Sequence, residues 1–130
     1  MKNELKKQIM DIAPYMFNYE GSDNIQQSLL PFGFECCDGW YGILKELVEK
    51  IAQIDKDKTV KVVQVKEKFG TLRFYIEGGS KEIYDLIDKA ETKSETTCEY
   101  CGAEGRSRGY SWAITLCDNC YTRYQNGDRK

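Results

Sequence analysis

Four of the six cysteines in this chain form two Cys-x2-Cys pairs, and these pairs constrain the fold more than any other feature of the sequence. The first pair is Cys98 and Cys101, and the second pair, after fifteen intervening residues, is Cys117 and Cys120. Each pair can form a tight turn that points two sulfur atoms at one ion, and Gly102 permits the positive φ that such a turn needs. Because four soft thiolates in a tetrahedron favour zinc, we predict one zinc ion per chain.

The residues between and after the pairs are typical of a treble-clef zinc finger. Gly105 and Gly109 bracket a basic turn, apolar residues alternate over 112–116 as in a strand, and residues 118–127 predict a short helix that ends at Asn-Gly. Disulfide bonds and a thioredoxin-like redox pair are the alternatives to a metal site. The opening segment MKNELKKQIMDI lacks the apolar core of a secretory signal, so we expect a reducing cytoplasm, which disfavours disulfides. A redox pair normally lies in a βαβ unit, which the sequence does not predict.

A zinc ion bound by four thiolates has no open position for water, so the predicted metal is structural rather than catalytic. The chain also contains no histidine. This excludes a histidine general base, a Ser-His or Cys-His nucleophile pair and a histidine metal ligand, and we expect that the protein is not an enzyme. Cys36 and Cys37 are adjacent and cannot easily bind one metal together, so we expect them to be small packed residues.

The sequence before the finger predicts helices and one β-hairpin, and therefore an α+β fold. The evidence is a set of one-sided apolar stripes and two runs rich in β-branched and aromatic residues. The predicted elements are a first helix near the N-terminus, a helix over 39–54, hairpin strands over roughly 60–67 and 71–77, and a helix over 80–93. We assign Asn3, Asp38 and Ser80 as the N-caps of the three helices. We divide the 130 residues into a body of 1–95 and a zinc finger of 96–130 packed on it.

Positive charge concentrates in the middle of a chain whose net charge is −2, because residues 56–81 carry seven Lys and Arg against three Asp and Glu. Lys66, Lys68, Arg73 and Tyr75 can share one face of the predicted hairpin. Such a face would suit phosphate or an acidic protein patch with Tyr75 as anchor. An ordinary solvated hairpin face explains the same pattern.

Three arginines extend the candidate binding surface into the finger: Arg106, Arg108 and Arg123. Zinc fingers use such residues for contacts with nucleic acid or protein, and a solvated loop is the alternative. Tyr121 and Tyr124 are expected to pack the short helix on the finger hairpin rather than to stack on bases.

Three stretches of the chain, "PFGFECCDGWYGIL", "VVQVKEKFGTLRFYIEG" and "CEYCGAEG", together resemble a family of small proteins encoded in bacteriophages and prophages. The resemblance covers roughly residues 31–102. Most members of that family have no assigned function. In this chain Cys37 stands where the family usually has glycine, Thr71 stands where it often has glycine, and the family pattern does not guarantee the second Cys-x2-Cys pair.

The resemblance implies expression in the cytoplasm of an infected bacterium. Small phage proteins of this kind commonly bind host machinery, and some that contain zinc are anti-CRISPR proteins that block a CRISPR effector nuclease. We therefore expect a non-catalytic protein that binds and inhibits a host protein, with no membrane association. The alternative is a nucleic-acid-binding zinc protein in phage transcription or replication, and steep salt dependence of binding would distinguish it.

Overall fold

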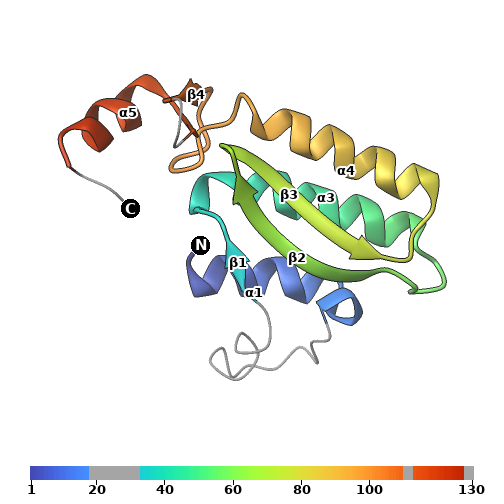
Figure 1. Cartoon of the computed structure of the whole chain (residues 1–130). Helices are drawn as coiled ribbons and strands as arrows, with labels where there is room; N and C mark the ends of the chain where they lie inside the picture. The colour runs from blue at the N-terminus through green and yellow to red at the C-terminus, as the bar shows by residue number, and fades with distance from the viewer. Residues whose placement is uncertain (18–32, 110–112, 128–130) are drawn as a thin grey trace.

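The computed structural model describes residues 1–17, 33–109 and 113–127, and it has the α+β fold that the sequence predicts (Figure 1). Four α-helices, two short 3-10 helices and two small sheets make up this part of the chain. The elements are α1 (Asn3–Ile12), a 3-10 helix (Pro14–Phe17), β1 (Phe34–Glu35), a 3-10 helix (Asp38–Trp40), α3 (Tyr41–Ile54), β2 (Lys61–Lys68), β3 (Thr71–Glu77), α4 (Lys81–Ser94), β4 (Arg106–Arg108), β5 (Ile114–Leu116) and α5 (Asp118–Gln125).

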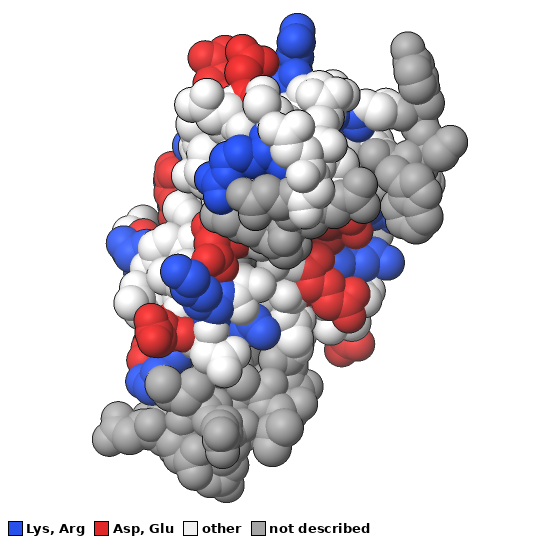
Figure 2. Space-filling model, turned by 90° about the vertical axis from the view of Figure 1, so that its left-hand side faces the viewer, with Lys and Arg blue, Asp and Glu red and all other residues white. Residues whose placement is uncertain are grey.

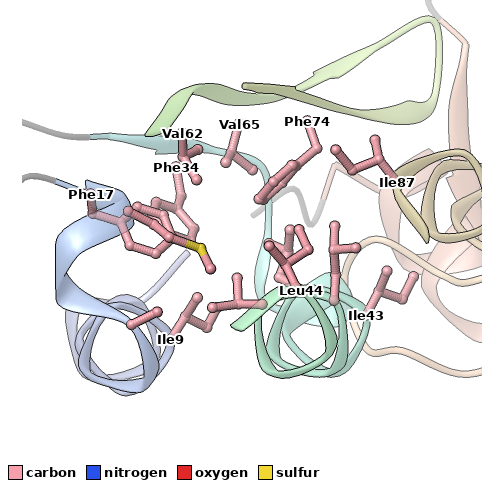
Figure 3. Packing of buried hydrophobic residues seen from close by; sticks show 14 of the residues in the cluster. Ile9, Phe17, Phe34, Ile43, Leu44, Val62, Val65, Phe74 and Ile87 are labelled. Carbon is pink, nitrogen blue, oxygen red and sulfur yellow. The ribbon is translucent and has the colours of Figure 1, made fainter. Parts of the chain in front are cut away.

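The body is a three-stranded sheet with helices on or beside one face. The strand order is β1-β2-β3, with β1 parallel and β3 antiparallel to β2. Inward side chains of the sheet meet those of α1, α3 and α4 in one core, as the close view in Figure 3 shows. Val65, Leu44 and Ile9 in this core are completely buried. The sequence did not predict β1, which is only two residues long and shows no alternation.

Helix α3 forms because its apolar residues recur at helical spacing. Ile43, Leu47 and Ile51 lie on the buried stripe. The predicted span of 39–54 is correct at its C-terminal end, but its first residues form the 3-10 helix instead. Asp38 does not cap α3, because its side chain accepts a hydrogen bond from the backbone N–H of Lys2 at 2.7 Å.

The first helix also differs from the prediction at its start. Lys2 occupies the N-cap position of α1 and Asn3 is the first helical residue, so the predicted Asn3 cap is wrong. The third predicted cap is confirmed, because the Ser80 hydroxyl accepts a hydrogen bond from the N–H of Ile83 at the start of α4.

Helix α4 also covers the free edge of the sheet. The backbone N–H of Leu72 donates to Ser94 Oγ at 2.8 Å, and the N–H of Phe74 donates to Glu91 Oε2 at 3.0 Å. These N–H groups point away from β2 and would otherwise lack partners in a sheet. The Ser94 and Glu91 side chains thus fix the position of α4 beside β3.

A buried carboxylate fixes the connection between α3 and β2. Asp55 accepts hydrogen bonds from the Tyr15 hydroxyl at 2.6 Å and from the N–H groups of Thr59 and Val60 at 3.1 and 3.0 Å. Burial opposes ionisation, but these hydrogen bonds outweigh it and lower the pKa of Asp55 to about 2. Asp55 is therefore a structural anion whose oxygens are occupied by its own chain.

Candidate metal centre and exposed sheet face

The finger is built as two turns joined by a small hairpin and followed by a helix. β4 pairs antiparallel with β5, and α5 begins directly after Cys117. Residues 106–108, predicted as a basic turn, form strand β4 instead, and residues 114–116 confirm the predicted strand. Trp112 lies outside the described residues.

The four predicted cysteines converge on one point. The Sγ atoms of Cys98, Cys101, Cys117 and Cys120 all lie within 4.8 Å of one another, and those of Cys101 and Cys117 are 3.6 Å apart. Zinc–sulfur bonds of about 2.3 Å in a tetrahedron separate sulfur atoms by about 3.8 Å, so the spacing suits a metal site. It is too long for a disulfide, whose S–S bond is about 2.05 Å, and all six cysteines of the chain are free.

The backbone around the centre favours thiolate at Cys98 and orients the sulfur of Cys117. Burial raises the pKa of Cys98, but hydrogen bonds from the backbone N–H groups of Cys117, Cys101 and Tyr100 outweigh it and lower the value to about 7. Cys117 is the N-cap of α5, and its sulfur accepts a hydrogen bond from the N–H of Cys120 at 3.4 Å. This hydrogen bond fixes the Cys117 sulfur at the start of α5, close to the other three thiols.

The first turn of the finger lies directly against the body. The N–H of Gly39 donates to the carbonyl of Glu99 at 2.7 Å, and the indole N–H of Trp40 donates to the carbonyl of Thr97 at 2.9 Å. A Cβ atom at position 39 would lie only 2.2 Å from the carbonyl oxygen of Cys98. Only glycine fits this close approach of two backbones.

The second part of the finger contacts the tip of the body hairpin. The Thr115 hydroxyl on β5 donates to the carbonyl of Gly70 at 2.6 Å, and the carbonyl of Thr115 accepts from the N–H of Glu99 at 2.9 Å. Thr115 therefore joins the β2–β3 hairpin to the first cysteine turn. No local pattern indicates this contact, because Thr115 lies 45 residues from Gly70.

Cys36 and Cys37 are packed residues, as predicted. Cys36 belongs to the body core and Cys37 packs against the finger core. Burial, followed by the nearby Glu99 carboxylate, raises the pKa of Cys36 to about 12 and that of Cys37 to about 11. Both side chains are therefore neutral thiols at neutral pH.

The strand register brings the four predicted residues of the hairpin face together. Lys66 is directly opposite Arg73, and Lys68 and Tyr75 lie two residues further along their own strands on the same face. The Lys66 ammonium lies 5.9 Å from the centre of the Tyr75 ring, which is 42% exposed. Arg73 also lies 4.0 Å from Glu91 of α4. These residues, Lys66, Lys68, Arg73 and Tyr75, form what we call the basic-aromatic face.

The three finger arginines have different environments. Arg108 is buried, donates to Asp118 Oδ1 at 2.8 Å and to the Leu116 carbonyl at 3.0 Å, and lies over the Tyr121 ring. It therefore stabilises the finger itself, contrary to its predicted role as a surface residue. Arg106 on β4 and Arg123 on α5 are exposed.

The aromatic residues of the finger have the predicted structural role. Tyr121 and Tyr124 pack against the finger core, and Tyr124 lies 6.4 Å from Tyr100 between ring centres. Seen from the side of the molecule that α5 occupies, acidic and basic residues alternate among the described atoms (Figure 2). The described residues on this side therefore do not form a surface of one sign.

One exposed residue of the hairpin escaped prediction. Phe69, at the tip between β2 and β3, is 70% exposed and has a positive φ of 55°. The sequence could have indicated this unusual residue, because a two-residue hairpin loop normally has Asn or Gly at the position before Gly70, where this chain has Phe.

The fold and the four converging thiols define an α+β protein with a treble-clef-like C-terminal finger whose four cysteines are placed to bind a metal ion. No protein family, curated protein or solved structure was found to match this chain. Among the helices of the described residues, none combines the length and the apolar character needed to cross a membrane.

Proposed function

We propose that this protein is a zinc-stabilised binding protein that inhibits a host macromolecule by occupying its surface, without turnover. The observation that carries the proposal is the basic-aromatic face of Lys66, Lys68, Arg73 and Tyr75. These side chains alternate with the buried residues of β2 and β3, so the core does not require them. Cations around an exposed tyrosine are typical of the centre of a binding surface.

Zinc is the metal that best fits four thiolates, and it has a structural role here. The finger has a small core formed mainly by the cysteines, Leu116 and tyrosines, which is too little apolar surface to fold without support. Metal binding would then contribute directly to its folding. Elemental analysis of protein purified without chelator should find one zinc per chain, and iron or no metal would contradict this assignment.

We propose a host protein as the partner rather than a nucleic acid. The chain has a net charge of −2, and four thiolates around Zn²⁺ add negative charge when the metal is bound. The resemblance to phage and prophage proteins supports action in the cytoplasm of an infected bacterium. Within that setting, a CRISPR effector nuclease is the partner we propose, which would make this an anti-CRISPR protein.

The proposal is tested first in cells. A bacterium with an active CRISPR system should accept a targeted plasmid when it expresses this chain, and the double variant Arg73→Glu/Tyr75→Ala should lose this protection. Lys81→Glu/Tyr84→Ala is the matched control, because it removes one exposed cation and one exposed tyrosine from α4 with the same change in charge. If expression of the parent chain does not protect the targeted plasmid, the proposal of a CRISPR effector nuclease as partner is wrong.

A second experiment tests binding independently of CRISPR. Host proteins retained by the tagged chain are identified, purified and titrated with it in 50 and 200 mM salt. A protein partner should bind at a fixed ratio, and its affinity should fall for the Arg73→Glu/Tyr75→Ala variant but not for the control. A nucleic acid would instead lose about 10³-fold or more in affinity over this salt range if it made several phosphate contacts.

A further inference from the structure

Phe69 occupies a turn position that disfavours a bulky side chain. Its φ of 55° lies in the left-handed region, which is unfavourable for any residue with a Cβ atom and most of all for a bulky one. Gly70 follows with a φ of 80°, so both loop residues have the positive φ of a type I′ turn, which Asn-Gly satisfies best. The ring is also 70% exposed, the largest exposure among the large apolar side chains that the structure describes.

The hairpin tip that carries Phe69 is held from both sides. The N–H of Gly70 donates to Glu67 Oε2 at 2.7 Å, and the Thr71 hydroxyl donates to the Lys68 carbonyl at 3.0 Å. The finger adds a third hydrogen bond, from the Thr115 hydroxyl to the Gly70 carbonyl at 2.6 Å. An exposed ring on such a braced turn is pre-organised, and it loses little conformational freedom when a partner binds it.

From these observations we infer that Phe69 is the anchor of the basic-aromatic face and inserts into an apolar pocket of a protein partner, a pocket rimmed by carboxylates. This inference rests on the proposed function and names the partner's surface. The charge beside the anchor sets the chemistry of the rim. The Lys68 ammonium lies 5.6 Å from the centre of the Phe69 ring, and Lys66 and Arg73 follow along the same hairpin. Cations next to an apolar anchor complement acidic residues around a pocket.

Among the described residues, the apolar hollow of a second copy does not complement the tip, and the hollow rimmed by Asp88, Glu91 and Glu95 is otherwise lined only by Thr71, Arg73 and Thr92, without an apolar floor. The apolar hollow between α3 and α4 has a floor that includes Leu47 and Leu86, but Lys50, Lys89 and Lys93 line it with only one carboxylate, Glu46. The lysines of the hairpin tip would meet lysines there, which is unfavourable. We therefore commit to a foreign protein with an acidic rim around an apolar pocket as the occupant, and self-association and nucleic acid are outcomes that would overturn the inference.

The occupant is identified by crosslinking from the anchor position. A photoreactive benzoyl-phenylalanine replaces Phe69 in one strain and Tyr84 of α4 in another, because Tyr84 is 45% exposed and far along the chain from the tip. Irradiation of living bacteria should join one host protein to position 69 but not to position 84. A crosslink to nucleic acid, to a second copy, equally to both positions, or to nothing would overturn the inference.

The host protein identified by the crosslink is then purified by itself and titrated with two variants of this chain. Each variant replaces a residue of positive φ by Asn, which tolerates that conformation better. Phe69→Asn should raise the Tm by about 3 °C because Asn tolerates this conformation, and it should weaken binding by about 30-fold or more because an anchor is lost. Lys58→Asn is the control, since Lys58 has a φ of 54° in the α3–β2 connection. The Lys58→Asn variant should have a Tm at least as high as that of the parent and should bind the partner with the parent's affinity.

Unchanged affinity of Phe69→Asn would overturn the inference even where the protein is more stable. The proposed function and this inference can fail independently, and the two variants distinguish the cases. If Arg73→Glu/Tyr75→Ala loses binding but Phe69→Asn does not, the face binds without this anchor. If neither variant loses binding, the face is not the interface and both proposals fail.

Discussion

The junction between body and finger can be tested by adding a single methyl group at Gly39. In Gly39→Ala the new Cβ atom would lie 2.2 Å from the carbonyl oxygen of Cys98 and 2.5 Å from that of Glu99. Nonbonded carbon and oxygen atoms normally lie at least about 3.3 Å apart, so the two backbones must separate by about 1 Å. No flexible side chain can move to relieve the clash, because both atoms belong to the backbone.

The magnitude follows from the contacts that such a separation breaks. The 2.7 Å hydrogen bond from Gly39 to Glu99 is lost, and those from Cys37 to Glu99 and from Trp40 to Thr97 are weakened. A buried donor left without a partner costs about 1–3 kcal/mol, and overpacking adds about 1–3 kcal/mol. We therefore expect Gly39→Ala to lower the free energy of unfolding by about 2–6 kcal/mol.

Gly42→Ala is the matched control and should change stability in the opposite direction. Gly42 lies in the first turn of α3, and a Cβ atom there would have no neighbour within 4 Å. Alanine should therefore add up to about 1 kcal/mol. Urea denaturation of both zinc-loaded variants, followed by far-UV circular dichroism, measures the two effects. A Gly39→Ala variant as stable as the parent would refute the close approach of the two backbones.

Three further predictions concern the core, the buried carboxylate and the metal. Leu47→Ala should lower the free energy of unfolding by about 2–5 kcal/mol, measured by urea denaturation, because Leu47 is a buried core residue. Asp55→Asn should cost about 1–3 kcal/mol at pH 6. Because the pKa of Asp55 is lowered in the folded state, the parent's advantage over this variant should be complete above about pH 5 and disappear as the pH falls towards 2. Cys101→Ser or removal of zinc by chelation should abolish hydrogen-exchange protection mainly in residues 96–127, and unchanged protection there would contradict a structural metal.

Local rules were enough to predict the parts of the fold that depend on residues close in sequence. The apolar stripe of α3 and the Ser80 cap are decided within one or two turns of helix. The Cys98–Cys120 metal site was predictable for a similar reason, because each Cys-x2-Cys turn orients its own two sulfur atoms. Only the meeting of the two turns required the rest of the chain.

Several features that sequence reasoning missed depend on partners outside their own helix, strand or turn. Asp is a common N-cap residue, but the Asp38 side chain accepts a hydrogen bond from the N–H of Lys2, and α3 begins without a side-chain cap. The sequence predicts Arg108 as a surface cation, yet Asp118 and the Leu116 carbonyl bind it inside the finger. The two-residue strand β1 exists only because β2 lies beside it.

Three stretches of the described chain, residues 33–44, 62–78 and 98–105, meet one another in the fold. Gly39 of the first stretch bonds to Glu99 of the third, and Thr115 connects Glu99 to Gly70 of the second. The contacts between these stretches hold the finger against the body. The same contacts run from the metal centre to the hairpin tip. Because Thr115 lies in the strand just before Cys117, loss of the metal should loosen the turn that presents Phe69, and a structural zinc would thus support binding without touching the partner.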